Sequence, residues 1–69
     1  MELKMNSDEL KGRWKQVTGE AKRQWGKLTD DDAAVIDGDR EKLVGKIQEK
    51  YGKSKEEAEQ EVHDWVEKI

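Results

Sequence analysis

The chain has 69 residues, 45% of them charged, yet its formal net charge is only −3 and it contains neither cysteine nor proline. This length fits one domain, residues 1–69, whose first five residues we expect to be frayed. Without cysteine there is no disulfide or thiolate metal site, and His63 alone cannot build a zinc site, so we expect no metal and no cofactor. The longest apolar run, residues 33–36, is too short for a transmembrane helix or a secretory signal. The sequence therefore predicts a soluble, cytoplasmic protein with no membrane partner.

The first predicted helix runs from about Ser7 to Gly26. Asn6 and Glu9 have the spacing of a capping box, and Met5 and Leu10 occupy the two positions of a hydrophobic staple. Six apolar residues recur at intervals of three or four and so form one stripe on a helix: Leu10, Trp14, Val17, Ala21, Trp25 and Leu28. This stripe predicts a helix with one buried side.

The second predicted helix is short and begins after Thr29, whose hydroxyl can accept hydrogen bonds from N–H groups of the next turn. It runs to about Ile36, with Val35 and Ile36 facing inward. The run Asp30-Asp31-Asp32 places negative charge where the helix dipole favours it. It does not fit a calcium loop, because the sixth residue counted from Asp30 is Val35 and not glycine. We interpret the run as a charge cluster at a helix N-terminus.

The third predicted helix follows a break at Asp37-Gly38-Asp39 and runs from about Arg40 to Tyr51, with Gly52 as its C-terminal cap. A second capping box at Ser54 and Glu57 starts the fourth helix. The residues expected to face inward are Leu43, Val44, Ile47 and Tyr51 in the third helix and Ala58, Val62, Trp65, Val66 and Ile69 in the fourth. No segment alternates like a strand, so the predicted fold is all-α.

A spacing of glycines that occurs twice in the chain suggests how these helices are arranged. Gly12, Gly19 and Gly26 are seven residues apart, and an equally spaced set of glycines begins at Gly38. Apolar positions between the glycines match as well, since Trp25 corresponds to Tyr51. We therefore expect a compact bundle of about four helices arranged as two packed helical hairpins. The alternative is a coincidence in a chain rich in lysine and glutamate.

The charge is unevenly distributed along the chain. Residues 1–28 hold seven Lys and Arg against four Asp and Glu, whereas residues 29–41 hold one against six. Aromatic residues interleaved with lysines are typical of surfaces that stack nucleic-acid bases. Trp14, Trp25 and Trp65, however, share the apolar stripes of their helices, which favours a place in the core.

Five residues make up the candidate binding surface. Lys11, Lys15 and Lys22 lie together on one flank of the first helix, and Gly19 projects away from its apolar stripe. Gly45 lies opposite the stripe of the third helix. A glycine there could be a tolerated surface residue, part of a smooth strip that something approaches, or a means of keeping the helix marginal.

The spaced glycines and tryptophans resemble the CsbD-like family of small bacterial proteins. The matching pattern runs from Lys11-Gly12-x-Trp14-Lys15-Gln16 to Trp25-Gly26-Lys27-Leu28-Thr29-Asp30-Asp31-Asp32, and the run from Gly38 to Gly52 is similar to the second half of that family. The resemblance covers residues 6–65. It implies a bacterial cytoplasmic protein, a bundle of about four helices and an association with general stress responses. Since the family has no established catalytic activity, no functional residue carries over.

The sequence therefore predicts a non-enzymatic, stress-associated monomer that acts through its surface on a macromolecular partner that the sequence does not identify. Its polar composition resembles that of hydrophilins, which are thought to protect other macromolecules when water is scarce. The alternative is a small binding module whose basic first helix contacts nucleic acid or an acidic protein. His63 lies beside the stripe of its helix, with no serine or cysteine at catalytic spacing, so we name no catalytic residue.

Overall fold

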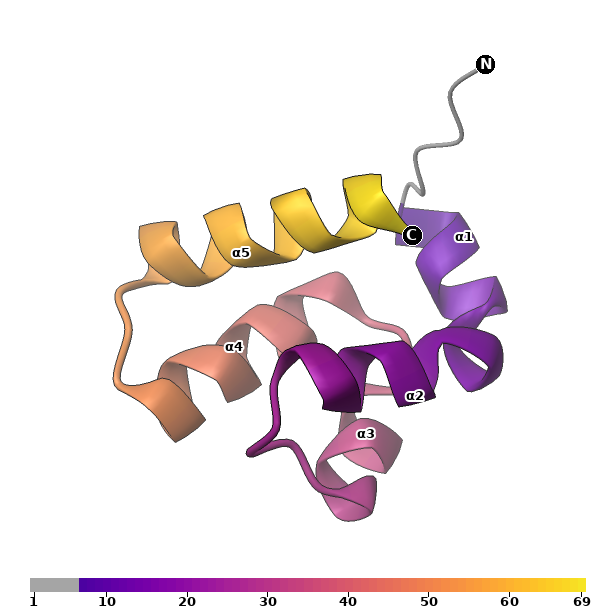
Figure 1. The fold of residues 1–69 in the computed structure, drawn as a ribbon, viewed down its shortest axis with the longest axis horizontal. Coiled ribbons are helices and arrows are strands. Elements are labelled where there is room, and N and C mark those ends of the chain that lie inside the picture. The colour runs from indigo at the N-terminus through magenta and orange to yellow at the C-terminus, as the bar shows by residue number, and fades with distance from the viewer. Residues whose placement is uncertain (1–6) are drawn as a thin grey trace.

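A computed structural model of the chain describes residues 7–69, which contain five helices (Figure 1). In chain order these are α1 (Ser7–Gly12), α2 (Trp14–Gln24), α3 (Asp30–Ile36), α4 (Arg40–Tyr51) and α5 (Lys55–Lys68). No residue in this described part of the chain belongs to a β-strand, so the predicted all-α class is confirmed. The expected capping box at Asn6 and the expected staple at Met5 lie outside the described residues.

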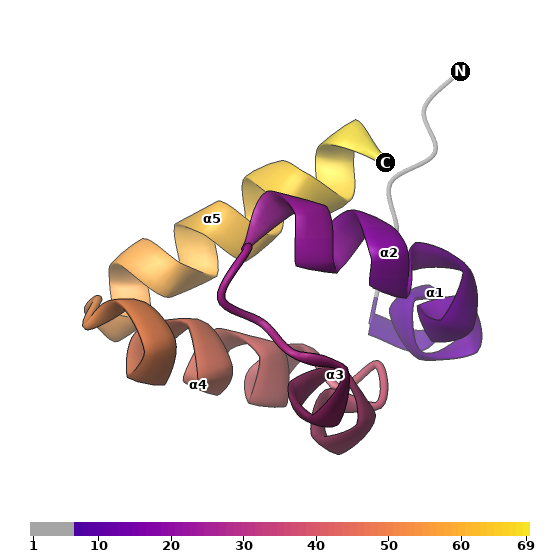
Figure 2. The same cartoon turned by 60° about the horizontal axis from the view of Figure 1, so that its bottom comes forward.

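The prediction of one continuous helix from Ser7 to Gly26 is wrong, because the chain bends at Arg13 between α1 and α2. Arg13 has φ −106° and ψ 10°. Its N–H still donates to the Glu9 carbonyl at 2.8 Å, and its carbonyl accepts from the Val17 N–H at 3.0 Å. The bend thus changes the direction of the chain without breaking these hydrogen bonds. It lets Leu10 and Trp14 both reach the core although α1 and α2 point in different directions (Figure 2).

The two-hairpin arrangement is not confirmed. Helices α4 and α5 do run antiparallel and side by side (Figure 1). Helix α3 has only 7 residues, against 14 in α5, and it runs across the direction of α2. In Figure 2, α1 and α3 are seen nearly end-on while the other three helices lie across the view. With only two turns, α3 is too short to pack along the length of α2 as α5 packs along α4.

The core lies between the N-terminal arm, which comprises α1 and α2, and the three later helices. The predicted stripe of the arm is buried, with Val17 half-buried at its edge. The later helices contribute Ala33, Ile36, Leu43, Val44, Ile47, Ala58, Val62, Trp65 and Val66, and Tyr51 is half-buried against them. Three large aromatic side chains supply much of the buried area in so small a core.

Two residues predicted to face inward do not. Val35 is 53% exposed and Ile69 is 36% exposed. The inward residues of α3 are Asp32, Ala33 and Ile36, which fall on one side of the helix and leave Val35 on the other. Ile69 follows the last residue of α5 and borders an open hollow that Glu20, Arg23 and Gln24 of α2 also line.

The predicted caps at Thr29, Gly52 and Ser54 are confirmed. The Thr29 hydroxyl accepts from the Asp32 N–H at 3.1 Å, and the Ser54 hydroxyl accepts from the Glu57 N–H, also at 3.1 Å. Gly52 ends α4 in the left-handed conformation with φ 65°. A capping hydroxyl of this kind typically contributes about 1 kcal/mol, so these caps fix where α3 and α5 start.

Candidate functional site

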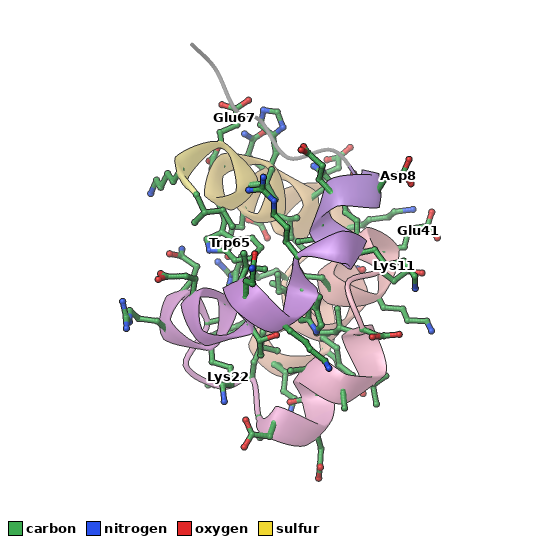
Figure 3. The ribbon with its side chains drawn as sticks, turned by 90° about the vertical axis from the view of Figure 1, so that its right-hand side faces the viewer. Asp8, Lys11, Lys22, Glu41, Trp65 and Glu67 are labelled. Atoms are coloured by element: carbon green, nitrogen blue, oxygen red, sulfur yellow. The ribbon has the colours of Figure 1, made fainter. Side chains whose placement is uncertain are left out.

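The three tryptophans hold the N-terminal arm onto the rest of the protein. The indole N–H of Trp14 donates to the Ala33 carbonyl at 2.8 Å. The rings of Trp25 and Trp65 meet edge to face, with centroids 5.2 Å apart and planes at 65°. Figure 3 shows Trp65 between α5 and α2. The prediction that these are core residues is confirmed, and their covered rings offer no platform on which bases could stack.

Two of the three lysines of the candidate surface, Lys11 and Lys22, pair with the acidic segment, residues 29–41. The Lys11 ammonium lies 3.9 Å from the Asp37 carboxylate, and the Lys22 ammonium is hydrogen-bonded to the Asp30 carboxylate. In Figure 3, Lys22 extends from α2 on the side where α3 lies. Lys15 is exposed, and no carboxylate within the described residues forms an ion pair with it. The uneven charge of the sequence is therefore partly neutralised within the molecule.

The glycines of the candidate surface lie on different helices, Gly19 on α2 and Gly45 on α4. Both are exposed, and a Cβ added to either would meet no atom within 4 Å. The glycines with positive φ in the described chain are two others, Gly38 and Gly52. Backbone conformation and close packing therefore do not require glycine at position 19 or 45.

A buried carboxylate that sequence reasoning missed lies at the start of α3. Asp32 is the buried charged residue of the described chain, and its two oxygens lie 2.7 Å from the Lys50 ammonium and 3.4 Å from the Lys46 ammonium. It also accepts the Thr29 N–H at 3.0 Å. The Lys50 hydrogen bond, followed by the Thr29 N–H, holds the pKa of Asp32 far below its usual range. These contacts fix α3 against α4.

A second missed carboxylate links α2, α5 and the loop before α5. One oxygen of Glu61 accepts the indole N–H of Trp25 at 2.9 Å, and the other is hydrogen-bonded to the Lys53 ammonium. Lys53 first, and then Trp25, lower the pKa of Glu61, and the same ion pair raises the pKa of Lys53. Glu61 thus satisfies the polar edge of a core tryptophan.

These two carboxylates have a structural role and are poorly suited to proton transfer. A general base works best when its pKa lies near the working pH, whereas the pKa values of Asp32 and Glu61 are lowered. Every oxygen of both groups already faces a cation or an N–H donor. Both groups therefore remain ionised at neutral pH and hold neighbouring helices together.

An open hollow follows the seam between α4 and α5 on the outer surface. Its floor includes Val44, and its rims carry charges of both signs from Arg40, Glu41, Lys55, Glu56, Glu59 and His63. His63 is exposed, and its Nε2 atom lies 3.0 Å from a carboxylate oxygen of Glu67. The mixed charges give the hollow no strong preference for ligands of one sign.

Two further properties hold for residues 7–69. No three His, Cys, Asp or Glu side chains in this range gather in a way that could hold a metal ion. None of the helices here combines the length and apolar character that a membrane crossing requires.

One of the missed residues carries a signal that the sequence contains. Asp32 is three residues after Thr29 and four before Ile36, so a capping box at Thr29 places it on the same side of the helix as the buried isoleucine. Glu61 has no comparable signal. Its partners Trp25 and Lys53 are far from it or on another element, and only the packing of α2 on α5 brings the three together.

The fold and surface define a small all-α domain with an aromatic core and an ion-paired, charge-dense exterior. The family model described as CsbD-like matches residues 8–60 of this chain. The chain is 62% identical over 61 residues to the UPF0337 protein YjbJ of Escherichia coli strain K12, covering 88% of each protein. It is 60% identical over 65 residues to the UPF0337 protein PA4738 of Pseudomonas aeruginosa, covering 94% of this chain and all of that protein. The chain therefore belongs to the CsbD-like family, as the sequence resemblance indicated.

Proposed function

We propose that this chain is a non-enzymatic, stress-associated cytoplasmic monomer that protects other macromolecules through its folded, charged surface. The observation that carries this proposal is the way charge is arranged on the outside of a small folded core. Ion pairs between oppositely charged side chains join different parts of the fold, as Lys11 pairs with Asp37 and Lys53 with Glu61. The large exposed hydrophobic residues of the described chain are Val35 and Ile69.

Such a surface supports protection by hydration and spacing. Interleaved charges keep a protein hydrated and dispersed, and scattered apolar residues offer little area for stable association. A folded particle of this kind can separate other macromolecules as water is withdrawn without binding any of them tightly. This mechanism needs no pocket, cofactor or reactive residue.

The alternative is a binding module in which the basic first helix contacts nucleic acid or an acidic protein. Lys15 supports it, because this lysine is exposed and forms no ion pair with residues 7–69. The pairing of Lys11 with Asp37 and of Lys22 with Asp30 weighs against it, because an incoming phosphate would have to displace a carboxylate already in place. We therefore favour protection.

Recovery of a labile enzyme after drying tests the proposal. The enzyme is dried and rehydrated with this chain, with an equal mass of a weakly charged helical protein, or with buffer alone. We expect the highest recovered activity with this chain, and recovery no better than with the weakly charged protein contradicts the proposal. Binding to a labelled single-stranded DNA that weakens steeply between about 50 and about 200 mM salt would support the alternative.

A further inference from the structure

The turn between α3 and α4 contains an aspartate followed by a glycine in an unusual conformation. Asp37 has φ 47° and ψ 39°, and Gly38 has φ 80°, so both lie in the left-handed region. The Asp37 side chain is 75% exposed. The Asp39 N–H closes the turn by donating to the Ile36 carbonyl at 2.8 Å.

Aspartate before glycine has a well-defined intrinsic chemistry. The Gly38 nitrogen can attack Cγ of Asp37, which forms an N–Cγ bond, expels one water and gives a five-membered succinimide. One water then reopens the ring, and cleavage at the α-carbonyl leaves the chain connected through the side-chain carboxyl as isoaspartate. The two steps lose and regain one water and need no other reactant. Glycine favours attack because it has no side chain to hinder it, and no acceptor in the described chain binds the Gly38 N–H.

The folded turn holds the two reacting atoms apart. Ring closure requires Cβ of Asp37 and the nitrogen of Gly38 on the same side of the Asp37 Cα–C bond. At ψ 39°, the tetrahedral geometry of Cα places Cβ almost opposite that nitrogen. Closure therefore needs a rotation of ψ by more than a right angle, which would break the hydrogen bond between Asp39 and Ile36.

Packing prevents this rotation while the protein is folded. Gly38 is buried against the N-terminal arm, and a Cβ on it would lie 2.5 Å from Cα of Lys11 and 3.2 Å from Cβ of Trp14. The turn backbone thus lies directly on the backbone of α1. Asp37 cannot reach the reactive geometry until the turn separates from α1, which is a local unfolding event.

The product would not fit back into this position. Isoaspartate adds one carbon to the main chain directly before Gly38, so Gly38 would have to shift, yet it packs so closely on α1 that an added Cβ would lie 2.5 Å from Cα of Lys11. The same residues end α3, through the Asp37 N–H on the Ala33 carbonyl at 3.0 Å, and precede the cap of α4 at Asp39. A lengthened turn therefore separates two helix ends that the native fold holds together.

We propose that Asp37–Gly38 is a covalent modification site controlled by conformation. It is protected in the folded protein, converts to isoaspartate when the turn between α3 and α4 opens, and then prevents the turn from closing. This inference does not depend on the proposed function. The amount of isoaspartate at position 37 therefore increases with the total time that the turn between α3 and α4 has been open.

Mass spectrometry on the aged full chain tests the proposal. The protein is incubated folded and in concentrated urea, digested, and analysed by a fragmentation method that distinguishes isoaspartate from aspartate. We expect isoaspartate at position 37 to form at least about tenfold faster in urea, since only the open turn reacts. Asp39 and Asp64, followed by Arg40 and Trp65, are internal controls and should convert much more slowly in both samples.

A second measurement tests whether the opening of the turn, and not urea itself, accelerates the formation of isoaspartate. The Trp25→Ala variant, which loosens the arm without denaturant, should also accumulate isoaspartate at position 37 faster than the wild type. Purified modified protein should show less helix and a lower melting temperature in circular dichroism. Equal rates in the folded and urea samples, or a modified protein with unchanged melting temperature, would overturn the proposal.

Discussion

Replacing both Gly19 and Gly45 with alanine should stabilise the protein. Both glycines are exposed in helices, and an added Cβ at either meets nothing within 4 Å. Alanine restricts the unfolded chain more than glycine does, so each replacement should raise the free energy of unfolding by about 0.4–1 kcal/mol. The two positions lie on different helices, so the effects should add to about 0.8–2 kcal/mol. In a domain of this size each kcal/mol raises the melting temperature by about 4–8 °C.

The matched control is Gly38→Ala, which makes the same chemical change in a different environment. Gly38 has φ 80°, where a side chain costs about 1–2 kcal/mol, and its new Cβ would overlap Cα of Lys11 at 2.5 Å. We therefore expect a marked loss of stability at position 38. Urea unfolding followed by tryptophan fluorescence measures all three variants. A lower midpoint for Gly19→Ala or Gly45→Ala would refute the assignment of these positions to open helix faces.

Three other predictions concern the core, the buried carboxylate and the surface charge. Trp25→Ala should cost about 3–5 kcal/mol and unfold much of the domain, measured by circular dichroism; retained helicity with loss of a ligand would make Trp25 a binding residue. The native state lowers the pKa of Asp32, so its contribution to stability is present at neutral pH and is lost as pH falls below about 4. Thermal unfolding of Asp32→Asn should accordingly show lower stability at neutral pH and a weaker dependence on acid, and an unchanged pH profile would contradict this. Asp30→Asn with Asp37→Asn should free Lys22 and Lys11 and increase retention on heparin, whereas the equal charge change in Glu56→Gln with Glu59→Gln should increase it less.

The sequence predicts those parts of the fold that depend on neighbouring residues. The capping box at Ser54 and Glu57 and the cap at Gly52 involve residues within one turn of each other, and the structure has both. The apolar stripes similarly identify the three tryptophans as core residues. Local patterns of this kind determine where helices start, where they end and which side they bury.

The features that the sequence does not predict depend on contacts between distant residues. The bend at Arg13 lies beside the position where Gly38 packs on Lys11. No residue near Arg13 in the sequence predicts this contact. The role of Glu61 requires Trp25, which is 36 residues away. The helical pattern predicts that the candidate lysines share one flank, but it does not predict that Lys22 pairs with Asp30 and Lys11 with Asp37, because the fold brings these residues together. Helix periodicity fixes neither a crossing angle nor the partner of a charged side chain.

The central claim is that protection comes from the folded surface and not from composition alone. The most direct test compares wild type with Trp25→Ala in the enzyme-drying assay, since the variant keeps the net charge of −3 and differs at a single buried residue. Circular dichroism first establishes that the variant has lost its helical fold. The account predicts that the wild type preserves the enzyme and that the unfolded variant, at equal concentration, preserves much less of it. Equal protection by the folded and unfolded chains would contradict the claim.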